Sequence, residues 1–257
     1  MTLKEPHRAT QRVIDILENI AYNSKEGLSL AEISTQLEAP KSSLFPIVHT
    51  LCENNFIQIN NQTGKYTMGF KTYELGNTFL CDDYVNASIL DIMHNISDQC
   101  RETCYFGELE DGDVYYLFKV DSPESLRMVN AGKKLPAYSC GIGKALLSDK
   151  SFDDLKKLYP ENLEPLTENT IKNINILYEQ LKQIRSQDIA FEKEESTKYI
   201  QCIAIPIRKN GKVRAAMSVA TPVFRYTPEK ETMIIGLLKQ AQLKIEPLIA
   251  SNNWSHF

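Results

Sequence analysis

Long hydrophobic runs are missing from the 257-residue sequence, and their absence excludes several classes of protein. No stretch of about 18 consecutive apolar residues occurs, so we expect no membrane-spanning helix. The opening residues, MTLKEPHRATQRV, lack the apolar segment of a secretory signal peptide, and we therefore expect a cytoplasmic protein. With 42% hydrophobic and 24% charged residues the composition is that of an ordinary globular chain, and its length allows one or two domains.

Closely spaced metal-ligating cysteines and known catalytic signatures are also missing. Among the six cysteines the nearest pair is Cys100 and Cys104, and no C-x-x-C sequence occurs, so we expect reduced thiols, no metal site and no cofactor. There is no H-E-x-x-H, G-x-S-x-G or dinucleotide-binding fingerprint. The four histidines are poorly placed to form a nucleophile pair with Cys140 or Cys202, and we therefore expect no enzymatic activity.

Positive charge is not in excess either. The chain holds 29 Lys and Arg against 33 Asp and Glu, a formal net charge of −4. This balance argues against a protein that coats nucleic acid through bulk positive charge, but it allows a small DNA-reading module.

The first part of the chain has the pattern of three short helices and a hairpin. Apolar residues recur at helical spacing from 8 to 22, and Gly27 ends this pattern. Ser29 and Glu32 form a capping box for a second helix, and Pro40 opens a third. Two β-type segments, 56–60 and 65–68, follow. The pattern predicts a winged helix-turn-helix whose third helix reads DNA, or alternatively a small helical domain used for protein contacts.

The rest of the chain has the pattern of an α+β domain with a mostly antiparallel sheet flanked by helices. A connecting helix at 70–82 comes first. Further helices are predicted at 85–100, 141–149, 152–158, 171–187 and 228–249. Strands are predicted at 103–109, 114–120, 126–129, 201–208 and 213–220.

Several short segments along the chain are informative when taken in order. They are Ala9–Leu17, Gly27–Ile33, Pro40–Ser43, Thr63–Gly69, Leu75–Gly76, Gly143–Leu147, Cys202–Pro206 and Ala216–Pro222. No single segment is specific, but together, in this order and at this spacing, they make the chain similar to the isocitrate lyase regulator (IclR) family of bacterial transcription factors.

The resemblance implies a winged helix-turn-helix DNA-binding domain at 1–69, a linker helix at 70–83 and a GAF-like effector-binding domain at 84–257. It implies a homodimer or homotetramer that binds double-stranded operator DNA and a small organic acid or related metabolite. The expected function is therefore a transcriptional repressor or activator whose operator affinity the metabolite controls. The alternative is a protein-interaction adaptor of the same fold with weakened DNA binding.

Candidate DNA contacts lie mainly on the third helix and the wing. The N-terminal end of that helix offers free backbone N–H groups and hydroxyls for phosphate and base edges, although Ser42 or Ser43 could instead only cap the helix. The candidates are Gln11, Arg12, Lys41, Ser42, Ser43, Phe45, His49, Thr50, Lys65 and Tyr66.

Two features of this module do not fit a typical DNA reader. Residues 1–80 hold 7 basic and 8 acidic residues, so we expect the glutamates at 18, 26, 32 and 38 to face away from DNA. Phe45-Pro46 stands where the family often has a His-Arg-like pair. Because a mid-helix proline lacks an N–H and costs about 3 kcal/mol, we predict a recognition helix that is bent or that begins late, at Ser43.

The resemblance also places an effector pocket in the second domain, at the Gly141-Ile142 turn before a helix. There the N–H groups of 141–143 offer an anion site. Glu192 stands where relatives often carry Asp, and Ala220 where some carry a second Ser, so the ligand has fewer or differently placed polar groups. Ser218 could instead be satisfied by backbone and Cys202 could be a plain buried thiol, while Tyr105, Tyr138 and Tyr199 could line a larger cavity. The expected pocket residues are Leu126, Met128, Leu135, Gly141, Ile142, Glu192, Ile200, Cys202, Ser218 and Ala220.

Overall fold

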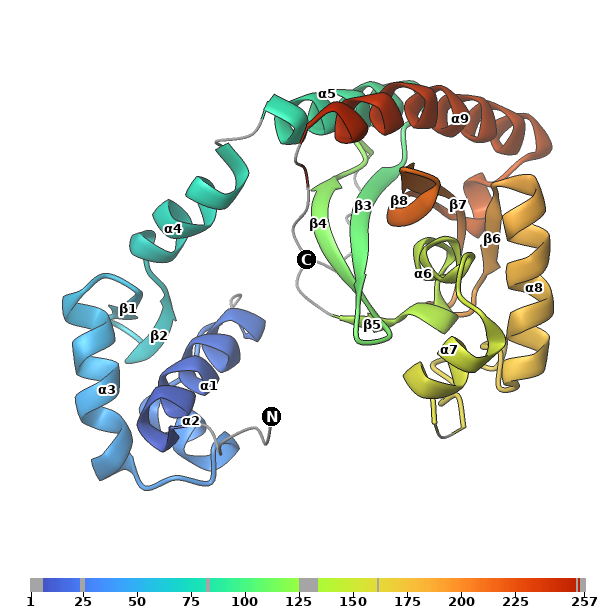
Figure 1. Ribbon diagram of the computed structural model, residues 1–257. Helices are drawn as coiled ribbons and strands as arrows, with labels where there is room; N and C mark the ends of the chain where they lie inside the picture. The colour runs from blue at the N-terminus through green and yellow to red at the C-terminus, as the bar shows by residue number, and fades with distance from the viewer. Residues whose placement is uncertain are drawn as a thin grey trace. The chain divides into compact units, whose positions relative to one another are not determined.

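The computed structural model describes residues 7–23, 26–81, 84–124, 134–160, 162–252 and 254. By its internal contacts the chain divides into two compact units, residues 1–83 and 84–257, and each is described by itself (Figure 1). Among the described residues, no helix combines the length and hydrophobicity that a membrane span requires.

The first unit contains three helices, a two-stranded hairpin and a further helix. The elements are α1 (Arg8–Tyr22), α2 (Leu30–Gln36), α3 (Lys41–Glu53), β1 (Ile57–Asn60), β2 (Lys65–Met68) and α4 (Phe70–Cys81). Ser29 and Glu32 form the predicted capping box at the start of α2, in which each residue's side chain bonds the other's backbone N–H. The strands pair antiparallel from Ile57–Met68 to Asn60–Lys65, which makes the predicted wing.

A small core holds these elements together. Gly27 takes a left-handed φ of 68°, and a Cβ atom there would lie 2.6 Å from the carbonyl oxygen of Tyr66, so the close approach of this turn to β2 requires glycine. The apolar faces of α1, α2, α3 and the hairpin bury a common set of side chains. They include Ile16, Ile20, Leu28, Ile33, Leu44, Val48, Leu51, Ile57 and Tyr66.

Helix α3 begins earlier than the sequence predicted. It runs from Lys41 with Pro40 as its N-cap, and Pro46 lies inside it as the sixth helical residue, so the predicted late start at Ser43 is wrong. The missing N–H of Pro46 deprives only the Ser42 carbonyl of its helical donor, and both residues are exposed, so water can serve that carbonyl. A bend at Pro46 stays a prediction.

The second unit is an α+β domain built on one six-stranded sheet, which confirms the predicted class. Strand order is β5-β4-β3-β8-β7-β6, and every neighbouring pair is antiparallel. The strands are β3 (Thr103–Glu110), β4 (Asp113–Val120), β5 (Leu135–Pro136), β6 (Ala190–Lys193), β7 (Ile200–Lys209) and β8 (Lys212–Pro222). The helices are α5 (Tyr84–Cys100), α6 (Gly141–Leu147), α7 (Phe152–Leu158), α8 (Ile174–Gln187) and α9 (Pro228–Ser251).

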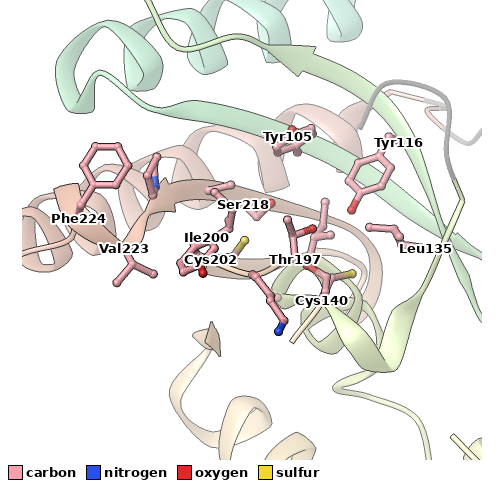
Figure 2. Close-up of a pocket in the computed structure, with 17 residues that line it drawn as sticks. Tyr105, Tyr116, Leu135, Cys140, Thr197, Ile200, Cys202, Ser218, Val223 and Phe224 are labelled. Carbon is pink, nitrogen blue, oxygen red and sulfur yellow. The ribbon is translucent and has the colours of Figure 1, made fainter. Parts of the chain in front are cut away.

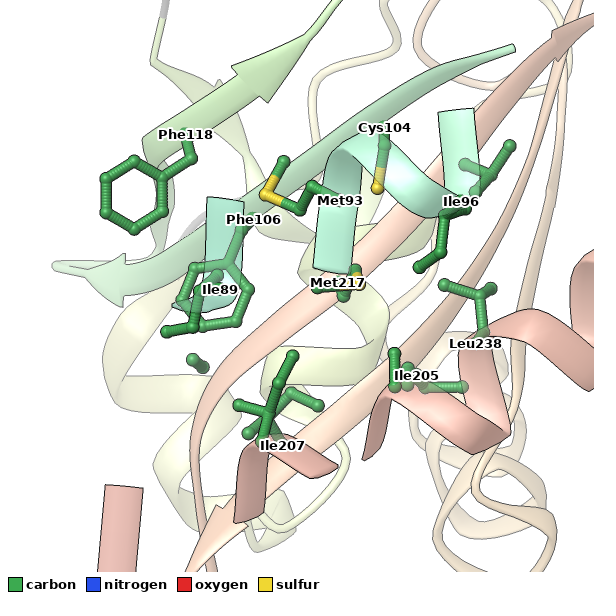
Figure 3. Packing of buried hydrophobic residues seen from close by; sticks show 14 of the residues in the cluster. Ile89, Met93, Ile96, Cys104, Phe106, Phe118, Ile205, Ile207, Met217 and Leu238 are labelled. Carbon is green, nitrogen blue, oxygen red and sulfur yellow. The ribbon is translucent and has the colours of Figure 1, made fainter. Parts of the chain in front are cut away.

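Helices cover both faces of the sheet. On one face α5 and α9 lie side by side, and the cluster beneath them includes Met93, Phe106, Met217 and Leu238 (Figures 1 and 3). On the other face α6 and α8 cover a second cluster. Because side chains alternate along a strand, Phe106 belongs to the first cluster and its neighbour Tyr105 to the second. The second face carries the apolar cavity described below.

The sequence did not predict two short strands, β5 and β6. Strands β5 and β6 have two and four residues, too few for a two-residue alternation to stand out. The predicted strand at 126–129 lies outside the described residues.

Candidate DNA-binding and ligand-binding sites

Helix α3 carries five of the ten predicted DNA contacts as exposed residues. Ser42, Phe45 and His49, spaced by three and four residues, are all exposed, and the Phe45 and His49 rings lie 6.1 Å apart. Lys41 and Thr50 are exposed as well. Phe45 is 53% exposed, and an apolar ring on this helix face suits contact with a thymine methyl group.

The hydroxyls of α3 are less available than the sequence analysis supposed. Ser43 Oγ donates to the Pro40 carbonyl at 2.8 Å, and Thr50 Oγ1 donates to the Pro46 carbonyl at 2.8 Å. The Ser43 hydroxyl is therefore engaged locally, but neither Ser42 nor Ser43 caps the helix, because Pro40 is its N-cap and no side chain in the described part of the chain bonds the free N–H groups. The backbone N–H groups of Lys41 and Ser42 begin the helix, where no helical carbonyl precedes them, and they remain the anion-binding feature of this end.

A groove of about 680 Å³ runs between the start of α1 and the start of α3. Arg12 and Ser43 lie in it, as predicted contacts, together with Arg8, which the sequence analysis did not single out. Arg8 precedes Arg12 by four residues and so shares its helix face, a spacing that could have identified it. Gln11 is outside the groove, and its Nε2 donates to Asp15 Oδ1 at 2.9 Å. The groove residues are His7, Arg8, Ala9, Arg12, Pro40, Ser43 and Ile47.

The wing differs from the expectation in two ways. Tyr66 is buried in the domain core, and burial raises its pKa, so its side chain is not presented for phosphate contact as the sequence analysis expected. Lys65 is available at the surface, but its Nζ lies 3.8 Å from the carboxylate of Glu26. Glu26 is therefore beside a predicted contact rather than turned away from it, while Glu32 is occupied in the α2 cap.

An apolar cavity of about 600 Å³ opens in the second domain and gathers most of the predicted pocket residues (Figure 2). Those that line it are Leu135, Gly141, Ile142, Ile200, Cys202, Ser218 and Ala220. Leu126 and Met128 lie outside the described residues. Tyr105 and Tyr199 line the cavity, but Tyr138 does not; its hydroxyl donates to the Glu164 carbonyl at 2.9 Å. Lining residues that the sequence analysis missed are Tyr116, Cys140, Ser196, Thr197, Lys198, Pro222, Val223 and Phe224.

Glu192 lies directly beneath this pocket without lining it. A Cβ atom built on Gly141 would be 3.1 Å from the Cβ of Cys202 and 3.4 Å from the Cβ of Glu192, which shows how closely the three pack. Glu192 is fully buried, and its Oε1 accepts hydrogen bonds from the backbone N–H groups of Glu195 and Ser196. Burial raises the pKa of Glu192, and the adjacent Cys202 thiol lowers it in part.

An unsatisfied polar group lies in the wall of the pocket. The Tyr105 hydroxyl is buried and has no hydrogen-bond partner among the described residues. Buried polar atoms without partners are rare in folded proteins, so they point to a bound molecule or water. Figure 2 shows Tyr105 and Tyr116 on one side of the cavity and Ile200 and Cys202 on the other.

The two thiols of the pocket are not activated. Burial raises the pKa of Cys140 to about 12 and raises that of Cys202 well above its usual value. A thiol with a raised pKa is protonated and a poor nucleophile near neutral pH. In the described part of the chain, no group of three or more His, Cys, Asp or Glu side chains is arranged to hold a metal ion.

A buried ion pair fixes the segment that forms one wall of the pocket. Lys144 of α6 is fully buried, and its Nζ lies 2.6 Å from both carboxylate oxygens of Glu195 and 3.0 Å from Oε1 of Gln180. Thr167 and Thr170 donate to the backbone carbonyl of Glu195. The residues that follow, 196–199, line the pocket, so this network ties the wall to α6.

Family models of both domains match the sequence. The model described as "Bacterial transcriptional regulator IclR C-terminal" matches residues 82–246, and the model described as "IclR helix-turn-helix domain" matches residues 9–59. Together with the α+β fold of the second domain, these matches define a bacterial transcriptional regulator that has a DNA-binding helix-turn-helix domain and an effector domain. The chain belongs to the IclR family of bacterial transcriptional regulators.

Individual relatives agree with this assignment. The chain is 29% identical over 239 residues to the HTH-type transcriptional regulator KdgR of Escherichia coli, covering 91% of this chain and 89% of KdgR. It is 31% identical over 221 residues to the regulator BhcR of Paracoccus denitrificans, covering 85% and 78% of the two chains. A solved IclR homologue from Microbacterium hydrocarbonoxydans, complexed with 4-hydroxybenzoate, has the same fold with a TM-score of 0.81 at 19% identity, covering 95% of this chain and 100% of the homologue.

Proposed function

We propose that this regulator binds operator DNA with its first domain and that a small organic acid, held in the 600 Å³ pocket, controls the operator affinity. The observation that carries the proposal is the unpartnered, buried Tyr105 hydroxyl on the wall of a largely apolar cavity. Such a cavity with a few convergent polar groups is the usual form of a small-molecule site.

The lining chemistry narrows the class of ligand. The Gly141 and Ile142 amides at the start of α6 suit a carboxylate, and the Tyr105 hydroxyl suits a second polar atom. Lys198 is the one lysine or arginine among the described lining residues, and most of the remaining wall is aliphatic or aromatic. We therefore propose a monocarboxylate with an apolar or aromatic body, a class to which the 4-hydroxybenzoate bound by the Microbacterium homologue belongs.

The proposed DNA-contact surface combines the α3 face with the basic groove. It consists of Lys41, Ser42, Phe45 and His49 on α3, with Arg8 and Arg12 on α1 and Lys65 in the wing. The N-terminal end of α3 and the Phe45 ring contact base edges, and Arg8 and Arg12 contact phosphates. This surface supports residues 1–69 as the DNA-binding domain and 84–257 as the effector domain.

We also propose that the protein acts as a homodimer or homotetramer assembled in part through the 70–83 linker. Phe70 and Tyr73 of α4 are 66% and 64% exposed, and Leu75 is 49% exposed. An exposed cluster of large apolar side chains is typical of a surface that a second copy covers. Dimerisation would place two recognition helices on two half-sites of an operator.

A direct test measures DNA binding by fluorescence anisotropy on fragments from upstream of the protein's own gene, with and without small organic acids. The acids are first screened for a rise in melting temperature, which any ligand of the native state must produce. We expect one fragment to bind with saturation and one acid to change its affinity. The adaptor alternative predicts a stable oligomer that binds none of the fragments at low salt.

A further inference from the structure

A second cavity in the effector domain, of about 550 Å³, shares no lining residue with the apolar pocket. It lies where two central strands stop pairing. The register of β3 with β8 runs from Thr103–Ala220 to Gly107–Ala216, where it ends. Glu108, the next residue of β3, and Arg214, two residues before Ala216 on β8, both line the cavity. The sheet therefore opens here into a wedge between β3 and β8.

Positive charge dominates this wedge. Its charged lining is Lys150, Lys209, Lys212 and Arg214 against Glu108 alone. Lys209 is already engaged, because its Nζ donates to the backbone carbonyls of Asn252 and Trp254 at 3.1 and 2.9 Å. Within the described residues, none of the other three cations forms an ion pair, although Arg214 is close enough to Glu108 to lower its pKa.

Glu108 gives the wedge a buried polar group at its base. The residue is 5% exposed, and its side chain forms no hydrogen bond with any described residue. Burial raises its pKa to about 7, against the opposing effect of Arg214. Near neutral pH a large share of the molecules therefore present a carboxylic acid O–H, which is a donor, in a ring of cations.

The neighbouring carboxylates are engaged with other groups. Glu110, two residues along β3, is bound to Lys134 at 2.6 Å. Asp149, beside Lys150, accepts a hydrogen bond from the Val213 amide at 2.9 Å and lies 3.7 Å from Arg208. The side chains of Leu109, Leu146, Val213 and Trp254 complete the wall and give it an apolar portion.

We propose that this wedge is a second ligand site, which binds a compact anion carrying two or more negative charges on a small organic body, such as a phosphate monoester or a polycarboxylate. Arg214, Lys212 and Lys150 contact the anion, and the protonated carboxyl of Glu108 donates a hydrogen bond to it. Binding is coupled to proton uptake, because the anion favours the neutral form of Glu108. The site is independent of the monocarboxylate proposed for the apolar pocket.

The test is calorimetric titration of the full-length protein at constant ionic strength with 3-phosphoglycerate, citrate and inorganic phosphate. We expect saturable binding of 3-phosphoglycerate or citrate, with weaker binding of inorganic phosphate because it lacks the organic body. The double variant Arg214→Ala/Lys212→Ala should weaken binding at least tenfold. Both residues are exposed, so the fold should persist, and circular dichroism checks this. Lys239→Ala, an exposed lysine on α9 that does not line the wedge, is the matched control and should bind normally.

Glu108→Gln separates this site from general attraction between charges. Wild type should take up protons on binding, measured at pH 7.5 in buffers of different ionisation enthalpy, and the Gln variant should bind without proton uptake. Three results would overturn the proposal: no saturable binding of any of the three anions, an equal loss in Lys239→Ala, or a loss caused by Gly141→Ala in the apolar pocket in place of the wedge variants.

Discussion

At the scale of single residues, the apolar pocket depends on a glycine that leaves room between Cys202 and Glu192. Gly141 has no side chain, and a Cβ atom there would approach the Cβ atoms of these two residues to 3.1 and 3.4 Å. Cys202 and Glu192 would have to shift by a few tenths of an ångström. The cavity would then narrow at the N–H groups that are proposed to bind the carboxylate.

Gly141→Ala should therefore weaken binding of the acid identified by the melting-temperature screen at least tenfold while lowering stability only slightly. Gly236→Ala on α9 is the matched control, because its Cβ would meet nothing within 4 Å, and it should bind normally and gain up to about 1 kcal/mol of stability from helix propensity. Isothermal titration with urea unfolding measures both quantities. Equal binding by the two variants would remove Gly141 from the site.

Glu108 should make stability depend on pH. Its folded pKa of about 7 is above the ordinary 4.5, so its contribution is fully present below about pH 4.5 and is lost as the pH rises through 7. Glu108→Gln stays neutral, and we expect it to raise the melting temperature at pH 8 but hardly at pH 5. Melting curves for wild type and variant that keep a constant separation from pH 5 to 8 would contradict this.

At the scale of elements, the wall of the pocket is held to α6 by the buried pair of Lys144 and Glu195. Removing one partner of a buried pair leaves an uncompensated charge, which typically costs 3–5 kcal/mol. Lys144→Ala should therefore lower the free energy of unfolding by about 3–5 kcal/mol. Lys144→Met with Glu195→Gln, which removes both charges, should recover a large part of the loss. Urea denaturation measures both, and a loss below about 1 kcal/mol in Lys144→Ala would contradict the role of the pair.

Helix α3 offers a second test at this scale. Pro46→Ala supplies the missing N–H for the Ser42 carbonyl, so we expect it to stabilise the first domain by about 1–3 kcal/mol. Thermal unfolding followed by circular dichroism at 222 nm checks this. An unchanged or lower melting temperature would contradict this, and would mean that the missing N–H of Pro46 costs the helix no stability.

The length and periodicity of an element decide whether the sequence could predict it. The amphipathic α1, the capping box of α2 and the long β7–β8 hairpin carry strong local signals. In the four residues of β6 burial alternates, but the buried positions are Ala190 and Glu192 and the exposed ones Phe191 and Lys193, so the residue types do not reveal the strand.

The exposure of Tyr66 was predicted wrongly because the residue follows Lys65 in a short hairpin, where the sequence gives no sign of burial. The backbone bridge between Leu28 and Tyr66, which packs strand β2 against the turn before α2, is a contact between distant parts of the sequence. The wedge at Glu108 depends on where β3 and β8 stop pairing, which no local pattern reveals.

At the scale of the whole molecule, neither domain is basic. Residues 1–80 contribute 7 − 8 = −1 and the remainder 22 − 25 = −3 to the formal charge of −4. The proposed operator binding must therefore rest on a few placed groups, such as Arg8 and Arg12, and on the avidity of the proposed oligomer. With few phosphate contacts, we expect a shallow dependence of that affinity on salt.

The most direct measurement is anisotropy of the protein on DNA from upstream of its own gene at about 50 mM salt, with wild type, Arg12→Ala and Gly141→Ala compared. The account predicts saturable binding by wild type, at least tenfold weaker binding by Arg12→Ala, and a response to the pocket acid that Gly141→Ala loses. A folded, oligomeric wild-type protein that binds no upstream fragment, or whose binding ignores every acid that raises its melting temperature, would contradict it.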